Sequence, residues 1–368
     1  MAALPIPKIA SGRLIKGADV HKALASYINS YYGKLLLITG AGCSSDSGIP
    51  VDSGTTNILT RFQDYKLVGN SSYNALETQR QRWWSRAIYS YYLNYLPAKP
   101  NKIHHLIKDL SHRVAFHGHI TLNVDGLFQK AGLKSDRFVE LSGNFLDDAI
   151  CSSCTASMNG MDHLSHTLAL NPIHSEHIAE LKATADLTKQ VSRRATMLPP
   201  HTPNGDMVVT NRMPVKFFNL VPCPKCSRKN MMPGQLLSGR ILPKPMLTKL
   251  NHICGAAPPG SVPKPLTEGQ LRLPEEEQKR IIAENEEELA TSTESPQAIL
   301  VLGSSLTESI ITWFLNRASL KNLPVAVVDS SPSSEWLLPK EPELVFEAPI
   351  RPALEGAMKL LAEMRSSI

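Results

Sequence analysis

The sequence of 368 residues lacks any long hydrophobic run. Its longest apolar stretches, residues 34–39 and 298–302, have only the length of a strand, whereas a membrane-spanning helix needs about 20 apolar residues. We therefore expect a soluble protein that has no membrane partner. Because 42% of the residues are hydrophobic and 20% are charged, the composition also excludes a wholly disordered chain.

The sequence also lacks a strong excess of one charge and a secretory signal. Lysine and arginine number 39 against 33 acidic residues, and the basic residues are spread along the chain. A nucleic-acid-binding surface normally has a basic stripe, so we expect no direct contact with nucleic acid. No long apolar segment follows the basic residues of the N-terminus, so we expect no secretory signal there. Residues 1–34 contain a single acid, Asp19, as expected for either a mitochondrial presequence or an ordinary tail.

Cysteine is scarce, since six cysteines are too few for a disulfide scaffold in a chain of this length. Four of them form two C-x-x-C pairs, Cys151 with Cys154 and Cys223 with Cys226. Four thiolates favour a closed, tetrahedral zinc site with a structural role, because catalytic zinc keeps an open position. Cys43 and Cys254 remain. Cys43 lies in a glycine-rich turn and is either a small buried side chain or a redox-sensitive thiol.

The order of expected elements favours an α/β fold with a parallel sheet. Residues 18–32 have helical spacing, and the apolar strand 34–39 runs directly into a glycine turn, which is how a dinucleotide-binding fold begins. Further strands are expected at 119–123, 298–302 and 325–328, and further helices at 77–95, between the last two strands, and at 351–364. We expect Trp83 and Trp84 to belong to the core rather than to a ligand platform.

The glycine turn, residues 40–50, reads GAGCSSDSGIP. Glycines allow the backbone to approach a phosphate, and the amides of a following helix can bind it. The turn is not a G-x-G-x-x-G motif because residue 45 is serine, so the glycines alone are equally compatible with a structural turn. The whole string, however, resembles the sirtuin motif G-A-G-x-S-x-x-S-G-I-P.

Other short motifs follow in the order found in sirtuins. Residues 100–104 resemble P-N-x-x-H, residues 121–127 resemble T-Q-N-[IV]-D-x-L, residues 140–143 resemble E-L-H-G, and residues 303–306 resemble G-[TS]-S-L. The sequence thus resembles the sirtuin (Sir2) family over roughly residues 20–330. Residues 80–86 resemble the R-x-R-Y-W-x-R signature of class II. That branch is mitochondrial in animals, so we expect a mitochondrial protein, or otherwise a cytoplasmic or nuclear one.

The resemblance implies a Rossmann-like sheet domain with an inserted zinc module, and a cleft in which NAD meets an acyl-lysine protein. It divides the chain into a tail (1–17), the first part of the NAD-binding domain (18–141), the zinc module (142–255), a loop and acidic helix insertion (256–295) and the second part of the NAD-binding domain (296–368). The implied NAD-binding residues are Gly40, Ala41, Gly42, Ser44, Ser47, Gly48, Asn123, Asp125, Gly303, Ser304, Ser305 and Asp329. Sirtuins usually have asparagine at the last of these positions, so Asp329 either accepts from a ribose hydroxyl or is an ordinary solvated acid.

The catalytic positions implied by the resemblance are Asn123, Asp125 and Ser142. In sirtuins a histidine at the position of Ser142 takes a proton from a ribose hydroxyl, but a serine hydroxyl does not accept a proton near neutral pH. A positioned general base contributes roughly 10²–10⁴-fold, so we expect weakened catalysis. His117 and His119 lie upstream on the entering strand, and either could replace the base only by an unusual arrangement.

Other departures from the family pattern lie on the substrate side: residues 51–53, Leu122 in place of glutamine, and the segment 233–240, which ends in Arg240. The sequence therefore predicts an NAD-dependent protein deacylase or ADP-ribosyltransferase with weakened or altered catalysis. The alternatives are an inactive homologue that acts as a sensor of NAD or ADP-ribose or as a scaffold, and a zinc-stabilised interaction module. The sequence makes no prediction of the oligomeric state.

Overall fold

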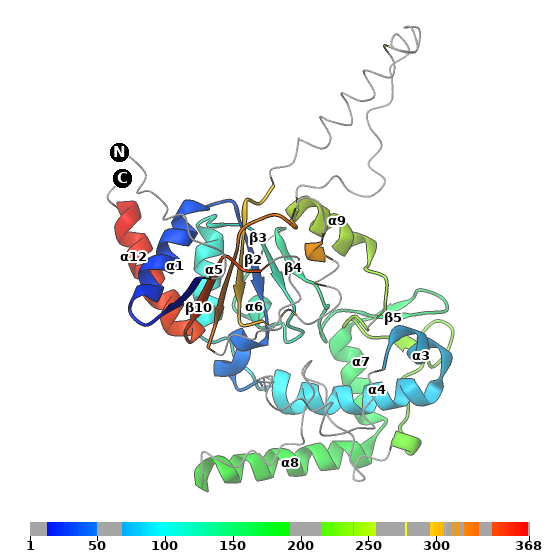
Figure 1. Ribbon diagram of the computed structural model, residues 1–368. Coiled ribbons are helices and arrows are strands. Elements are labelled where there is room, and N and C mark those ends of the chain that lie inside the picture. The colour runs from blue at the N-terminus through cyan, green and yellow to red at the C-terminus, as the bar shows by residue number, and fades with distance from the viewer. Residues whose placement is uncertain are drawn as a thin grey trace.

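The computed structural model (Figure 1) describes residues 13–49, 68–134, 136–191, 215–237, 239–254, 277, 295–304, 306, 311, 314–316, 320–330 and 341–366. Its main element is a seven-stranded sheet with the order β1-β10-β9-β8-β2-β3-β4, in which every neighbouring pair is parallel. The strands are β1 (Arg13–Lys16), β2 (Leu35–Thr39), β3 (Phe116–Thr121), β4 (Phe138–Glu140), β8 (Ala298–Leu302), β9 (Val325–Asp329) and β10 (Leu344–Glu347).

Helices cover both faces of this sheet, which explains why its central strands are apolar throughout. Every residue of β2 and β8 is buried, as is typical of a parallel sheet between two helical layers. One face packs against α1 (Asp19–Ser30), α5 (Lys102–His112), α6 (Leu127–Lys130) and α12 (Ile350–Ser366). The other face packs against α9 (Lys244–Ile253), which lies on the opposite side of the sheet in Figure 1. The expected α/β fold is confirmed.

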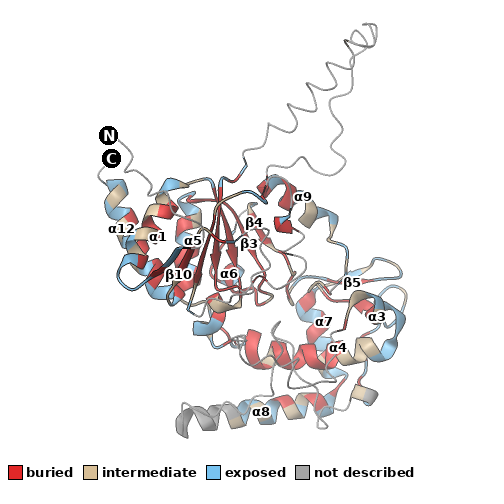
Figure 2. Cartoon of the chain, viewed as in Figure 1, coloured by how far each residue is buried: buried red, intermediate tan, exposed pale blue. Residues whose placement is uncertain are grey.

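A second core lies beside the sheet and is mainly helical. It contains α3 (Asn70–Ala75), α4 (Glu77–Ser90), the π-helix η2 (Tyr91–Tyr95), α7 (Gly160–Ala169), α8 (Pro172–Val191) and η3 (Val215–Phe217). A small antiparallel sheet adjoins it, with the order β6 (Ser157–Met158), β5 (Ala149–Cys151) and β7 (Met231–Met232). Trp83 and Trp84 are buried in this core, as predicted, and much of α4 is coloured as buried in Figure 2.

Three segments pack differently from the expected domain division, which itself stays a prediction. Residues 13–16 of the expected tail form β1, which pairs with β10 at the edge of the sheet. Residues 70–95 pack with the smaller core and not with the sheet. Helix α9, expected in the zinc module, packs Leu250 and Ile253 against β2 and β8. Each difference has the same cause. A segment packs against a part of the chain that is distant in sequence, and the order of residues alone does not reveal that contact.

Strand β3 begins at Phe116, three residues earlier than expected, and contains a bulge opposite Leu35 and Leu36. Its polar residues His117 and His119 weaken the apolar pattern on which the expectation depended. The expected acidic helix within 256–295 lies outside the described residues except for Glu277 and Ser295. Within the described part of the chain, no helix is long and apolar enough to cross a membrane.

Candidate functional site

The glycine turn lies at the carboxyl edge of the sheet, where β2 ends at Thr39. Residues 41–47 form a 3-10 helix, η1 (Ala41–Ser47), which ends at Gly48 in the left-handed region with φ of 82°. The Gly42 amide donates to the Gly303 carbonyl, which follows β8, over 2.9 Å. A Cβ on Gly40 would lie 2.6 Å from the Gly303 oxygen. The two loops therefore meet backbone against backbone, and a side chain at Gly40 would fill the space between them.

Ser44 is the centre of a buried polar cluster beneath this turn. Its hydroxyl donates to Asp125 Oδ2 over 2.6 Å and accepts from Asn123 Nδ2 over 3.1 Å. His104 Nε2 lies 3.4 Å from the same oxygen. Three segments that are far apart in the sequence thus converge on one hydroxyl group, and the structure brings together the predicted residues Ser44, Asn123 and Asp125.

The proton on His104 can be assigned from its two contacts. His104 Nδ1 accepts from the Asn101 amide over 3.2 Å, and burial lowers the pKa of His104 to about 4. The ring is therefore neutral, with its proton on Nε2, which faces Ser44. Sequence reasoning did not include Asn101 and His104 among the site residues, although the P-N-x-x-H motif contained the signal.

Asp125 is held as an acceptor on both of its oxygens. Oδ1 accepts from the Leu127 amide over 2.9 Å at the start of α6, and Oδ2 accepts from Ser44. Burial raises the pKa of Asp125, although these hydrogen bonds and the charge of Lys130 oppose the rise. The hydrogen bonds from Ser44 and Leu127 therefore stabilise the ionised form of the Asp125 carboxyl group.

The outer end of η1 is attached to two helices. Asn101 Nδ2 donates to the Cys43 carbonyl over 2.8 Å and to Ser47 Oγ over 3.0 Å. Asp46 lies 3.7 Å from Arg351 of α12. Cys43 itself is fully buried, and burial raises the pKa of its thiol, so it is a core side chain and not an exposed reactive thiol.

The remaining predicted nucleotide residues lie at the same edge of the sheet. Ser304 Oγ accepts from the Leu306 amide over 3.1 Å and so orders the turn after β8. Asp329 is the last residue of β9, and its charge, like that of Asp125, raises the pKa of the Cys43 thiol. Ala41 is the first residue of η1. Ser305 and residues 51–53 lie outside the described residues.

Ser142 follows β4 at this edge, and its backbone is held by the segment after β7. The Leu236 amide donates to the Ser142 carbonyl over 2.7 Å. Gly143 has φ of 63°, and a Cβ there would lie 2.3 Å from the Gly234 carbonyl oxygen. The loop that carries Ser142 is therefore packed directly against the segment 233–237.

Glu140 lies two residues before Ser142 and is also held firmly. Its Oε2 accepts from Asn144 Nδ2 over 2.6 Å and from Gln129 Nε2 over 2.5 Å. Burial raises the pKa of Glu140 to about 7. The β4 end therefore carries an acid that titrates near neutral pH beside the position of Ser142.

His119 lies some way before Ser142 along the sheet. In the parallel pair β3 and β4, His119 is level with Phe138, four residues before Ser142. At about 3.3 Å per residue this separates the two positions by ~13 Å along the strands. His119 Nε2 is also 2.9 Å from Thr39 Oγ1. The strand register therefore places His119 away from Ser142.

The predicted substrate-side residues are absorbed into packing. Leu122 is buried in the core between the sheet and α9. Arg240 Nη1 donates to the Pro233 carbonyl over 2.9 Å, so its side chain folds back on its own segment. Arg80 Nε donates to the Lys229 carbonyl over 2.9 Å and links α4 to the cysteine-bearing segment.

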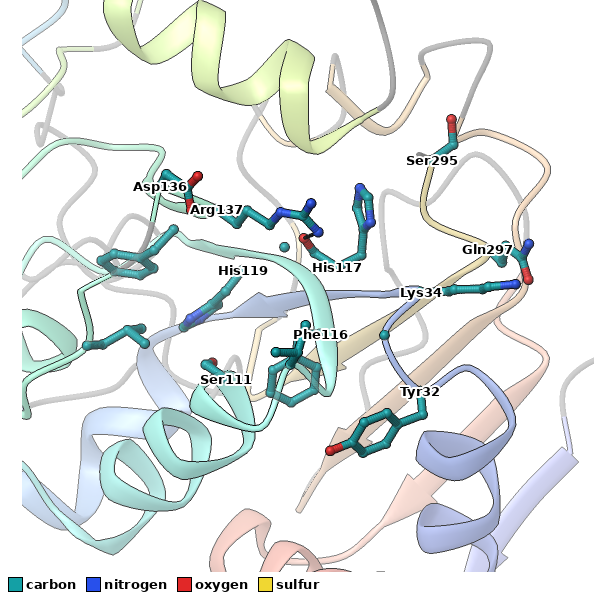
Figure 3. Close-up of a pocket in the computed structure, with 15 residues that line it drawn as sticks. Tyr32, Lys34, Ser111, Phe116, His117, His119, Asp136, Arg137, Ser295 and Gln297 are labelled. Carbon is teal, nitrogen blue, oxygen red and sulfur yellow. Dashed lines mark hydrogen bonds between the residues drawn. The ribbon is translucent and has the colours of Figure 1, made fainter. Parts of the chain in front are cut away.

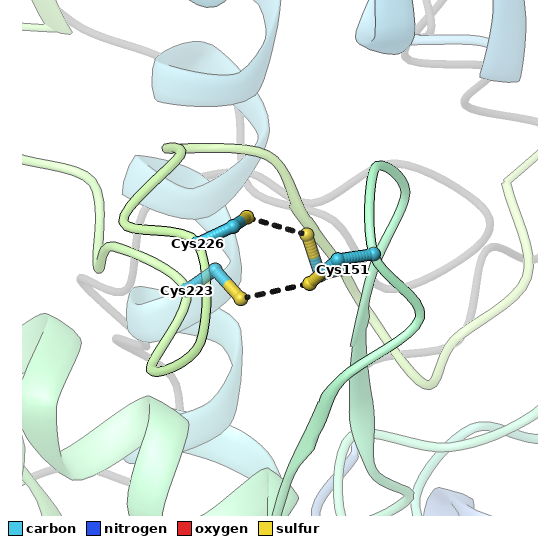
Figure 4. Close-up of side chains that lie close together, drawn as sticks. Cys151, Cys223 and Cys226 are labelled. Atoms are coloured by element: carbon cyan, nitrogen blue, oxygen red, sulfur yellow. Dashed lines mark hydrogen bonds between the residues drawn. The ribbon is translucent and has the colours of Figure 1, made fainter.

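The four cysteines meet in one cluster, and their Sγ atoms all lie within 4.8 Å of one another. The Sγ atoms of Cys151 and Cys226 are 3.6 Å apart, and those of Cys154 and Cys223 are 3.5 Å apart (Figure 4). Four sulfurs at about 2.3 Å from a tetrahedral zinc ion would be separated by ~3.8 Å. The donor set and its spacing therefore fit a structural zinc ion.

Two similar turns build this cluster. The Thr155 amide donates to the Cys151 carbonyl over 3.0 Å, and the Ser227 amide donates to the Cys223 carbonyl over 2.9 Å. Thr155 and Ser227, each directly after a C-x-x-C pair, have φ of 59°. Both pairs are thus presented by the same turn geometry.

Comparison with known proteins agrees with this arrangement. The model of the Sir2 family matches residues 40–233, slightly more than half of the chain. The chain belongs to the Sir2 family. Sir2 proteins use NAD, and the four-cysteine cluster of this chain fits a zinc ion.

One similar relative is the NAD-dependent protein deacylase SIR4 of Batrachochytrium dendrobatidis. It is 29% identical over 212 residues, which cover 57% of this chain and 65% of that protein. The chain spans between 46% and 65% of the length of the first three curated relatives that it matches.

Two solved structures share the fold of this Sir2 chain. A structure concerned with the mechanism and regulation of Sir2 enzymes has a TM-score of 0.54 at 18% identity and covers 93% of this chain and 98% of its own. A complex of a Sir2 homologue with NAD has a TM-score of 0.54 at 16% identity, with coverage of 96% and 98%.

Proposed function

We propose that this Sir2 chain binds NAD at the carboxyl edge of its sheet and removes acyl groups from protein lysines only weakly or with altered chemistry. The observation that carries the proposal is the contrast between the two sides of the site. The cofactor side keeps a fully connected cluster around Ser44, whereas serine occupies the position of the family histidine at Ser142.

The cofactor side supports the binding half of the proposal. Bound NAD supplies an ADP-ribosyl group whose bond to nicotinamide can be broken. Gly40 and Gly42 let the turn pack directly against the Gly303 loop, since a Cβ at either position would collide with that loop. A glycine-rich turn that follows a strand in this way suits the phosphates of a nucleotide. Asn123 and Asp125 add a donor and a carboxylate acceptor, which suit ribose hydroxyls.

The serine at residue 142 supports the catalytic half. A serine hydroxyl has no basic lone pair comparable with that of imidazole, whose pKa is near ~6.5. Without a positioned base the proton-transfer step loses roughly 10²–10⁴-fold. Asp125 already accepts from Ser44 and Leu127, so its contacts favour a binding and positioning role.

Arg240 and Leu122 support a second candidate, an NAD or ADP-ribose sensor or scaffold. Arg240 is bonded to its own segment, and Leu122 is a core side chain, so neither is arranged as a polar contact for an acyl-lysine chain. Transfer of ADP-ribose to another acceptor is the third outcome. Class II membership and a mitochondrial location stay predictions from the resemblance at residues 80–86.

The test is nicotinamide release by zinc-loaded protein with NAD and a pool of acyl-lysine peptides, followed by mass spectrometry. Ser142→His should raise release by about 10²–10⁴-fold, and Ser142→Ala, which removes the hydroxyl without adding a base, should leave it unchanged. NAD binding by calorimetry should be similar for all three proteins.

Each outcome assigns the function. Weak release by the native chain that rises in Ser142→His supports an impaired deacylase, and ADP-ribose found on protein would identify the transferase. Binding of NAD with no release from any variant supports the sensor. Absence of NAD binding would overturn the proposal.

A further inference from the structure

A cavity of about 760 Å³ opens at the amino edge of the sheet, opposite the nucleotide loops (Figure 3). It is lined by residues 32–34 before β2, 116–119 at the start of β3, 136–138 at the start of β4, and Ser295 and Gln297 before β8. All strands of this sheet are parallel, so their amino ends meet here and their carboxyl ends meet at Gly40 and Gly303. The volume is typical of a small-molecule site.

The walls of this amino-edge cavity are apolar inside and mainly cationic at the rim. Its apolar lining includes Phe116, Leu133 and Phe138, which are all buried. Lys34 and Arg137 line it with a single acid, Asp136. Figure 3 shows Arg137 and Lys34 on opposite flanks of the β3 end, with Phe116 and Ser111 on the helix side. Such a lining suits an anion with an apolar body.

Two buried polar atoms in this lining have no hydrogen-bond partner within the described part of the chain: Ser111 Oγ of α5 and His119 Nδ1 of β3. Most buried polar side-chain atoms in proteins are hydrogen-bonded, so an unpartnered pair in one cavity points to a missing ligand or water. The residue His119 is only 3% exposed, and both His119 and Ser111 line this cavity.

The other nitrogen of His119 is already in use. His119 Nε2 lies 2.9 Å from Thr39 Oγ1, and burial lowers the pKa of His119 to about 3, so the ring is neutral. A neutral ring carries one proton. If Nδ1 carries it, Nε2 accepts from the Thr39 hydroxyl, and Ser111 and His119 together offer two donors to the cavity.

We propose that the amino-edge cavity is a second ligand site, which binds a small carboxylate with an aromatic or branched apolar body. The carboxylate accepts from Ser111 Oγ and His119 Nδ1, Lys34 and Arg137 attract its charge, and the phenylalanine and leucine walls cover its body. A carboxylate is acceptor-only, so it holds the His119 proton on Nδ1 and makes Thr39 the donor to Nε2. Thr39 directly precedes Gly40, so the second site contacts the nucleotide turn through one side chain.

The test uses 3-phenylpropionate as the probe and zinc-loaded, full-length protein without NAD, so its result does not depend on the proposed function. We expect saturable binding by calorimetry with a Kd of about 1 mM. The neutral analogue 3-phenylpropionamide has the same shape and should bind about tenfold more weakly, because it lacks the charge.

Two variants and a matched control locate the binding. Ser111→Ala and Arg137→Gln should each weaken 3-phenylpropionate binding by about tenfold. Arg113→Gln removes the same charge from an exposed neighbour that does not line the cavity, and it should bind like the native chain. Equal binding of acid and amide, equal losses in the two arginine variants, or no saturable binding would overturn the proposal.

A spectroscopic readout covers the case in which a variant folds poorly. Long-range ¹⁵N–¹H correlation of histidine rings, with the His119 signals assigned by their loss in His119→Gln, reports which nitrogen carries the proton. Addition of 3-phenylpropionate to the native chain should give a protonated Nδ1 and an unprotonated Nε2. The opposite tautomer, or a His119 ring that does not respond at saturation, contradicts the site.

Discussion

Ser44→Ala is the sharpest perturbation of the buried cluster, because one oxygen atom serves three neighbours. The change removes a 2.6 Å hydrogen bond to the Asp125 carboxylate, and a hydrogen bond to a charged group contributes about 1.5–3 kcal/mol. It also removes the acceptor for Asn123 Nδ2 and for the longer His104 contact. We expect a loss of about 2–4 kcal/mol in the free energy of unfolding, a large part of the ~5–15 kcal/mol of a typical protein.

The loss should depend on pH in a defined direction. Burial already places the folded pKa of Asp125 above its unfolded value, and loss of the Ser44 donor raises it further. Between the two pKa values the folded state binds more protons, so stability falls as pH rises. Ser44→Ala should therefore be more damaging at about pH 8 than at about pH 5, when urea unfolding is measured at both.

Ser45→Ala is the matched control in the same turn. Ser45 is exposed, and its hydroxyl donates only to the nearby Gly42 carbonyl over 3.0 Å, so the change should cost no more than about 0.5 kcal/mol. Equal losses for the two variants, or a Ser44→Ala loss that is the same at both pH values, would refute the role assigned to the cluster.

Three further predictions concern neighbouring features. The folded pKa of Glu140, about 7, lies above its unfolded value of about 4.3, so the native chain loses stability as pH rises between the two values. Glu140→Gln has no such charge to bury. Its free energy of unfolding in urea at about pH 8 should therefore exceed that of the native chain by about 1–2 kcal/mol. Gly143→Ala should cost more than Gly17→Ala in thermal unfolding: both have positive φ, worth about 1–2 kcal/mol, but only Gly143 would meet the Gly234 carbonyl. Cys226→Ser should lower bound zinc from about one ion per chain to near zero, whereas Cys254→Ser, outside the cluster, should leave the metal content unchanged.

The fold was predictable where burial leaves a continuous apolar signal. The fully buried strands β2 and β8 lie within one residue of their expected bounds. Strands β1 and β10 have four residues each, and β1 buries only Ile15, so their pairing cannot be recognised before the sheet is assembled. The packing of α9 has the same origin, since this helix joins the sheet only through contacts with distant strands.

The candidate site was predictable as a set of residues but not as a set of bonds. Short motifs identified Ser44, Asn123 and Asp125, yet the convergence of all three on one hydroxyl depends on how β2 and β3 lie side by side. The His104 contact needs α5 to pack against the same edge. The amino-edge cavity had no sequence signal, because its lining comes from segments that meet only when four parallel strands begin at one edge.

The loop that carries Ser142 is held in place by backbone contacts, so the activity depends on the side chain at this position. The Ser142 carbonyl is bonded to the Leu236 amide, and Gly143 is in contact with Gly234. Neither contact involves the Ser142 side chain, so both contacts can form with a histidine at 142. In Ser142→His the new side chain is therefore added to a backbone held by the same contacts. A change in nicotinamide release by this variant then reports the effect of the added base.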